Sequence, residues 1–134
     1  MINHDKNVLV NYRLEQSEET LTEISFLIDN GHLSLAVNRI YYSIFYAISA
    51  VAIKDNFSTS KHKKLLGWFN KNYINTGILK KEFGSLIYAA FENREKSDYD
   101  FLFEITKEEI LKYFRLAENF VEEIKKLLED VTKQ

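Results

Sequence analysis

The sequence predicts an all-α protein, an up-and-down bundle of four or five helices, and three observations support this fold class. The 134 residues include no proline and only four glycines, so few positions force a helix to stop. Apolar residues recur at steps of three and four along most of the chain, which is the spacing of one helix face. Eight Tyr, ten Phe and one Trp supply volume for a core. At this length we expect a single domain, residues 1–134.

The bundle is expected to be organised around the stretch 36–52, AVNRIYYSIFYAISAVA. Its apolar residues cover most of the circumference of a helix, so the helix should lie between several partners, with Phe45 fully buried. Arg39, next to Asn38, interrupts this apolar surface. A guanidinium at such a position must reach water, pair with a glutamate on another helix, or meet an anion.

Four further helices are predicted around this one. A first helix covers about 6–29 and ends at Asn30-Gly31, because glycine adopts the left-handed conformation without a Cβ clash. Ser60 is expected to cap a short third helix, about 61–73.

The second half of the chain contributes the last two helices. A fourth helix is predicted over about 78–95, followed by a loop over 96–105. Thr106 and Glu109 form the capping-box pattern, which predicts the start of a last helix that continues to the C-terminus.

Composition narrows the range of functions. The absence of cysteine excludes disulfides, thiolate zinc sites and a cysteine nucleophile. His4, His32 and His62 do not have metal-ligand spacing, so neither a metal site nor a cofactor is predicted. The sequence has neither a signal pattern nor a long uncharged apolar span, and we expect a cytoplasmic protein that does not bind membranes.

Positive charge gathers in the middle of the chain. Residues 54–81 contain seven lysines and one acid, Asp55. Lysines beside aromatic residues such as Trp68 and Tyr73 are typical of a surface that binds an RNA backbone and stacks its bases. A solvated helix surface that balances acidic neighbours gives the same pattern, and the sequence leaves both interpretations open.

Short motifs along the chain have the order and spacing of a known family. Arg39 stands before the paired Tyr41 and Tyr42, Lys61-His62 opens the next helix, and Arg94 is followed by Asp98-Tyr99. In these motifs, and over nearly the whole chain from about residue 36 to 128, the sequence resembles the HEPN (higher eukaryotes and prokaryotes nucleotide-binding) family. It looks most like the branch with an Arg-x-x-x-Asp-Tyr motif. The resemblance implies an up-and-down helical bundle that commonly dimerises.

The resemblance also implies a range of functions. Many HEPN proteins are ribonucleases, often toxins held in check by a minimal nucleotidyltransferase, and their nuclease motif is an Arg followed four to six residues later by a His. Here Tyr99 stands five residues after Arg94, and no histidine follows His62. A phenol with a pKa near ~10 is a poor base at neutral pH. We therefore expect binding of a nucleotide or RNA phosphate to exceed cleavage, and catalysis stays an open question.

The candidate site follows from the same motifs. Arg94, Asp98 and Tyr99 are the candidate catalytic residues, at the end of the fourth helix and in its loop. The candidate ligand-binding residues are Arg39, Tyr42, Lys61 and His62. The three candidate catalytic residues are expected to converge with Arg39, and whether His62 reaches Arg94 is left open. Asp98 is expected to serve both arginines when no ligand is bound. The competing interpretation is a structural ion pair that holds the loop to the bundle.

Alternative interpretations of these residues are weaker. Gly84-Ser85 with Asp98 and Asp100 is similar to the nucleotidyltransferase signature. In nucleotidyltransferases that signature needs a turn that leads into a β-strand, whereas here the residues after Gly84-Ser85 are predicted to be helical. The tyrosines of the central helix suit a base-stacking cage or simply a core. At the level of function, the alternative is a non-catalytic helical adaptor that docks a nucleotidyltransferase partner.

The excess of aromatics and the resemblance predict a homodimer through the second and fourth helices.

Overall fold

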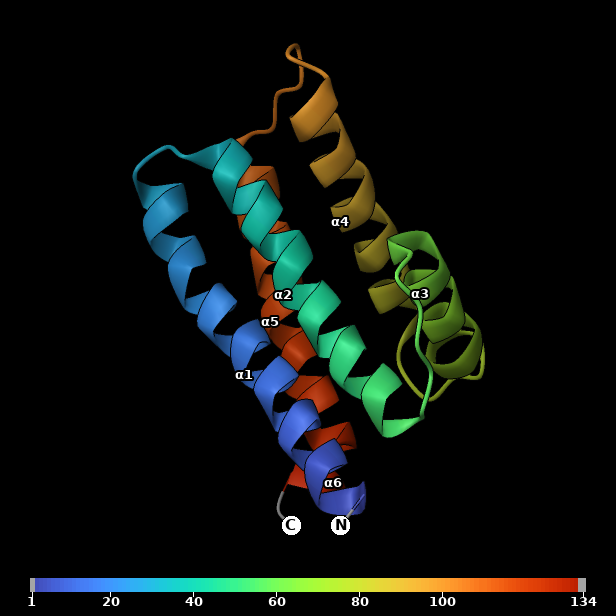
Figure 1. The fold of residues 1–134 in the computed structure, drawn as a ribbon. Helices are drawn as coiled ribbons and strands as arrows, with labels where there is room; N and C mark the ends of the chain where they lie inside the picture. The colour runs from blue at the N-terminus through green and yellow to red at the C-terminus, as the bar shows by residue number, and fades with distance from the viewer. Residues whose placement is uncertain (1, 133–134) are drawn as a thin grey trace.

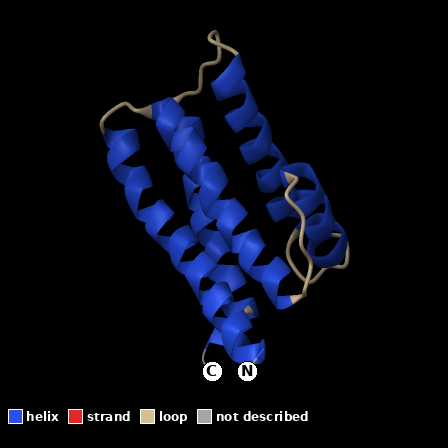
Figure 2. Cartoon of the chain, in the orientation of Figure 1, coloured by secondary structure: helices blue, strands red, loops and turns tan. Residues whose placement is uncertain are grey.

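Helix α2 (Leu33–Lys54) runs through the middle of the molecule and packs against α1 (Ile2–Asp29), α4 (Lys81–Tyr99) and α5 (Lys107–Leu127), as Figure 1 shows. The computed structural model describes residues 2–132, and within that range the chain contains helices and connections but no strand (Figure 2). The predicted all-α bundle is confirmed. The central place of the most apolar helix follows from its composition, because a helix that is apolar all round must be covered on every side.

The remaining elements are short and lie at the edges of the bundle. Helix α3 (His62–Phe69) packs against α2 and continues without a break into one π-helical turn, η1 (Asn70–Ile74). A final turn, α6 (Glu129–Thr132), packs against α1 and α5. The predicted third helix, about 61–73, therefore corresponds to α3 and η1 together.

Several predicted boundaries are confirmed. Gly31 has φ 76° just beyond α1, and Gly77 has φ 82° in the turn before α4, so both glycines occupy the left-handed region. At the start of α5 the backbone N–H of Glu109 donates to Thr106 Oγ1 at 3.1 Å, and the capping box is complete.

Two boundary predictions were wrong. Ser60 does not cap α3, because the helix begins one residue later and Lys61 occupies the N-cap position without a side-chain hydrogen bond. Helix α4 continues to Tyr99 instead of ending near Glu95. No glycine or proline occurs between Glu92 and Asp100, so nothing in that segment stops the helix.

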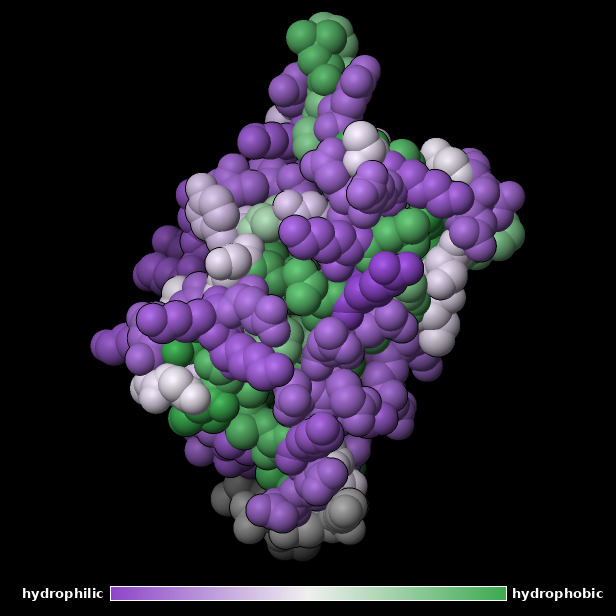
Figure 3. All heavy atoms as spheres, turned by 180° about the vertical axis from the view of Figure 1, so that it is seen from behind, coloured by the Kyte–Doolittle hydropathy of each residue, from purple (hydrophilic) through white to green (hydrophobic). Residues whose placement is uncertain are grey.

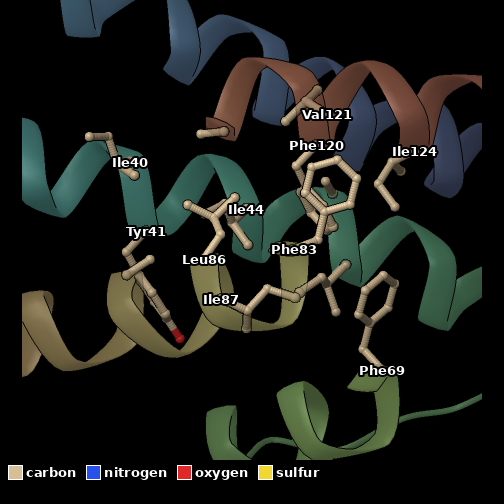
Figure 4. Packing of buried hydrophobic residues seen from close by; sticks show 14 of the residues in the cluster. Ile40, Tyr41, Ile44, Phe69, Phe83, Leu86, Ile87, Phe120, Val121 and Ile124 are labelled. Atoms are coloured by element: carbon tan, nitrogen blue, oxygen red, sulfur yellow. The ribbon is translucent and has the colours of Figure 1, made fainter. Parts of the chain in front are cut away.

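The core lies where α2 faces α4 and α5. Figure 4 shows Ile44 of α2, Phe83 and Leu86 of α4, and Phe120 of α5 packed together, and all four are almost fully buried. The prediction that Phe45 is fully buried was wrong. Phe45 is half-buried, because it lies on the side of α2 that faces α3, where its ring stacks on His62 with 4.2 Å between centroids.

Helix α2 is also long and apolar enough to cross a membrane by length and composition alone. Its apolar residues are packed against the other helices, as in the core helix of a bundle.

A different apolar feature is exposed. The tip of the α4–α5 connection (residues 99–102) projects beyond the bundle in Figure 1, and its hydrophobic side chains stand out at the top of Figure 3. Tyr99, Phe101 and Leu102 are 83%, 95% and 74% exposed.

Candidate functional site

Tyr41 connects the polar side chains of three helices. Its ring leaves α2 on the side that faces α4 (Figure 4) and is buried, whereas its hydroxyl is hydrogen-bonded to Nδ1 of His62 on α3 at 2.8 Å. The guanidinium carbon of Arg94, on α4, lies 4.7 Å from the centroid of the same ring. A cation this close to a tyrosine ring is attracted by its negative face. His62 and Arg94, 32 positions apart in sequence, therefore meet at one residue.

Arg94 has little hydrogen bonding inside the protein. Its Nε is buried and has no hydrogen-bond partner among the described residues. Among residues 2–132 it has one ion pair, to Asp98 one turn further along α4, which is loose at 3.7 Å, and its side chain is 17% exposed. The guanidinium is thus held in place mainly by rings and by its own helix. Its planar N–H groups suit the bidentate binding of an oxyanion.

Arg39 also lies near the ring of Tyr42. The guanidinium carbon of Arg39 lies 5.5 Å from the Tyr42 centroid, and that of Arg94 lies 5.9 Å from it. Arg39 donates from Nε and one terminal nitrogen to Oδ1 of its neighbour Asn38, at 3.1 and 2.8 Å. Two arginines therefore lie near one ring.

The prediction that Asp98 serves both arginines was wrong, because Asn38 satisfies Arg39 and Asp98 pairs with Arg94 alone. The Asn38 amide leaves the charge of Arg39 uncompensated, and the loose pair with Asp98 compensates the charge of Arg94 only in part. The pair of arginines keeps its attraction for an anion.

His62 is kept neutral at physiological pH. Burial, and secondly the positive charge of Arg94, lower the pKa of His62 below its usual value. Burial also raises the pKa of Tyr41, so this phenol keeps its proton. The neutral imidazole has one protonated and one free nitrogen. In the tautomer with the proton on Nδ1, the ring donates to the Tyr41 oxygen and Nε2 is left free to accept a proton from a ligand.

Two of the predicted site residues stand apart from this cluster. Tyr99 is 83% exposed at the end of α4, because the helix extends further than expected and carries it beyond the bundle. Lys61 is exposed at the N-cap of α3, where its backbone N–H donates to Thr59 Oγ1. Arg39, Tyr42, His62, Arg94 and Asp98 are brought together.

Sequence reasoning underrated Tyr41. A buried tyrosine on the central helix was interpreted as core, and it is core, but its hydroxyl also orients His62. The signal was present in the sequence, because a tyrosine at the centre of an apolar helix needs a partner for its hydroxyl, and polar partners are few.

Across residues 2–132 no three His, Asp or Glu side chains gather as a metal site would require.

Comparison with known proteins places this chain in a family. A match to the HEPN domain covers residues 10–127. A Thermotoga maritima protein of the group named UPF0332 is 36% identical over 130 residues, covering 97% of this chain and 98% of the relative. Two proteins of Methanocaldococcus jannaschii, named "Putative toxin MJ0142" and "Putative toxin MJ0605", are also similar. They are 33% and 30% identical and cover 86% and 98% of this chain, which spans 78% and 97% of their own lengths.

The chain belongs to the HEPN family, because the family match and the relatives extend over most of its length. The resemblance inferred from the short motifs is confirmed at the level of the family.

Proposed function

We propose that this protein binds RNA phosphate through Arg94, Arg39 and His62, and that it is the toxin of a toxin–antitoxin or defence pair. Its proposed partner is a minimal nucleotidyltransferase that neutralises it in the cytoplasm. The observation that carries the binding proposal is Arg94, a partly exposed guanidinium with an unpartnered Nε and only a loose ion pair. A phosphate that replaces or joins Asp98 would provide the close, charge-assisted contacts that Arg94 lacks.

The proposed role as a toxin rests on the two relatives that carry that name. Induced expression in a bacterial host is the direct test. Wild-type protein should arrest growth, Arg94→Ala should not, and co-expression of a minimal nucleotidyltransferase encoded beside the gene should restore growth. Arg115→Ala, on an exposed position of α5, is the matched control and should arrest growth like the wild type. Arrest by Arg94→Ala at the same protein level would contradict the proposal.

One observation favours a second function, cleavage of RNA. His62 lies in the cluster with Arg94, although it precedes Arg94 in sequence and occupies no Arg-x(4–6)-His motif. In the tautomer with its proton on Nδ1, His62 can take the proton of a ribose 2′-hydroxyl on Nε2. The 2′-oxygen then forms a bond to phosphorus as the bond to the 5′-oxygen breaks, the leaving 5′-oxygen takes a proton from water, and Arg94 stabilises the charge on the phosphate. The chemistry needs no metal.

Separate variants distinguish binding from cleavage. His62→Gln should remove cleavage and leave RNA affinity within about threefold, because the glutamine amide is uncharged like the imidazole and can still hydrogen-bond the phosphate. Arg94→Ala should remove cleavage and also lower RNA affinity about tenfold to a hundredfold. Product release from a labelled single-stranded RNA, followed by gel, measures the rate. If the wild type binds RNA and releases no product, the protein is a binding module. If it binds no RNA but copurifies with the nucleotidyltransferase, it is the helical adaptor.

A further inference from the structure

A groove runs between α3 and α4 beside the arginine cluster. It has a volume of about 330 Å³, with Lys63, Gly67 and Asn70 on one wall and Tyr88, Phe91 and Glu92 on the other. Glycine leaves the α3 wall open, because a Cβ at Gly67 would meet nothing within 4 Å. A space of about 330 Å³ is large enough for a purine base, and its lining combines the α3 backbone at Gly67 with the rings of Tyr88 and Phe91.

Asn70 gives the groove a polar group without a partner. It is the first residue of the π-helical turn η1, and its Oδ1 is buried without a hydrogen-bond donor among the described residues. A buried acceptor in this state destabilises the protein, and π-helical turns occur often at functional sites. Asn70 lines this groove and also a second hollow beside Ile74, Lys81 and Gly84. A ligand in the groove would reach the amide, which has one acceptor and two donors, when the side chain turns toward it.

Aromatic and charged side chains complete the walls. The Tyr88 side chain is 67% exposed. The Lys63 ammonium lies 5.8 Å from the centroid of Phe91, and the guanidinium carbon of Arg94 lies 5.9 Å from the same centroid. Phe91 is thus shared by the groove and the arginine cluster. A base in the groove would lie one ring away from a phosphate on Arg94.

We propose that this groove binds the adenine base of a nucleotide or of single-stranded RNA. Tyr88 and Phe91 provide stacking surface, which every base uses. Asn70 selects adenine, because an asparagine amide pairs with adenine through N6 and N7. Glu92 is placed to accept from ribose hydroxyls, and Lys63 lies near the phosphate side. The connection to a phosphate at Arg94 rests on the function proposed above, whereas base binding stands on the groove alone.

Nucleosides test the groove without any phosphate. Titration of ¹⁵N-labelled protein with adenosine should shift the backbone amides of α3, η1 and the middle of α4. Inosine, in which an oxygen replaces the 6-amino group, should bind about tenfold more weakly, because it loses the pairing with the Asn70 oxygen. Asn70→Ala should bring the two dissociation constants within about twofold of each other.

Gly67→Leu fills the groove. It should retain the fold, since leucine favours a helix more than glycine does and the space beside Gly67 is open, and it should abolish adenosine binding. Gly67→Ala, the matched control, should bind adenosine like the wild type. Equal affinity for adenosine and inosine, unchanged binding by Gly67→Leu, or no adenosine binding by the wild type would each overturn the proposal.

Ribose 5-phosphate separates this proposal from the function above. It has no base, so its binding should require Arg94 and be indifferent to Gly67→Leu. If ribose 5-phosphate binds and adenosine does not, the groove proposal fails and the phosphate site stands. If adenosine alone binds, the groove proposal stands and the phosphate site fails.

Discussion

At the scale of single residues, the site depends on three rings that serve both packing and chemistry. Tyr41 is buried, yet its hydroxyl holds His62 and its ring supports Arg94. The guanidinium carbons of Arg39 and Arg94 both lie near the Tyr42 ring centroid, at 5.5 and 5.9 Å, and Phe45 stacks on the His62 ring. A substitution among these rings should therefore change both the stability and the position of the charged groups, with the balance set by how deeply each ring is buried.

Phe45 illustrates this balance. Phe45→Ala should cost about 2 kcal/mol of unfolding free energy, because the ring is only half-buried. The matched control is Phe83→Ala, whose ring is 2% exposed and whose loss should cost about 3–5 kcal/mol. Urea unfolding measures both. Equal costs for the two variants would show that Phe45 is more deeply packed than the structure indicates.

His62 makes stability depend on pH. Its pKa in the folded protein lies below the unfolded value of about 6.5, so the unfolded chain binds more protons as the pH falls through that value. The stability present above about pH 6.5 should therefore be lost progressively as the pH falls below it. Thermal melting at pH 7.5 and 5.5 should show a larger loss for the wild type than for His62→Gln, which retains His4 and His32. Equal losses would place His62 in an ordinary solvated environment.

At the scale of elements, the start of α5 shows how a local motif fixes a helix. Thr106 and Glu109 complete a capping box, and α5 places Phe120 and Ile124 in the core. Thr106→Ala should destabilise the protein by about 1 kcal/mol, and Thr106→Ser, which keeps the hydroxyl, should stay close to the wild type. Chemical unfolding provides the comparison. No difference between the two substitutions would mean that the cap does not contribute to stability.

The sequence predicted the helices well because their causes are local. Apolar spacing, the glycines at 31 and 77 and the capping box all act within a few residues. Whether His62 reaches the neighbourhood of Arg94 was left open, because their meeting at Tyr41 depends on how α3 crosses α2 beside α4. No short sequence motif determines the angle at which helices pack. Tyr99 was misplaced for a related reason. Extending α4 by four residues turned an expected loop residue into an exposed one.

At the scale of the whole molecule, we predict a homodimer through α2 and α4. The tip (residues 99–102) exposes three large apolar side chains, and a partner that covers them would remove this unfavourable exposure. Light scattering at micromolar concentration should give twice the mass of one chain. Replacement of Phe101 and Leu102 by serine should weaken the dimer, whereas Ile78→Ser, at an exposed position before α4, should not. A monomer mass for the wild type would reject the dimer.

The central claim is that Arg94 is a phosphate-binding group and not a structural ion pair. Its ion pair with Asp98 is loose, so Arg94→Ala should shift the melting temperature by no more than a few degrees. The affinity for a labelled single-stranded RNA should fall about tenfold to a hundredfold, because a charge-assisted contact to phosphate is lost, while Arg115→Ala should leave it within about threefold. Fluorescence anisotropy measures the RNA affinity, and thermal melting of the same samples measures the stability. Lost binding with an unchanged melting temperature is the predicted result. Unfolding of Arg94→Ala, or RNA affinity equal to that of the wild type, would contradict the claim.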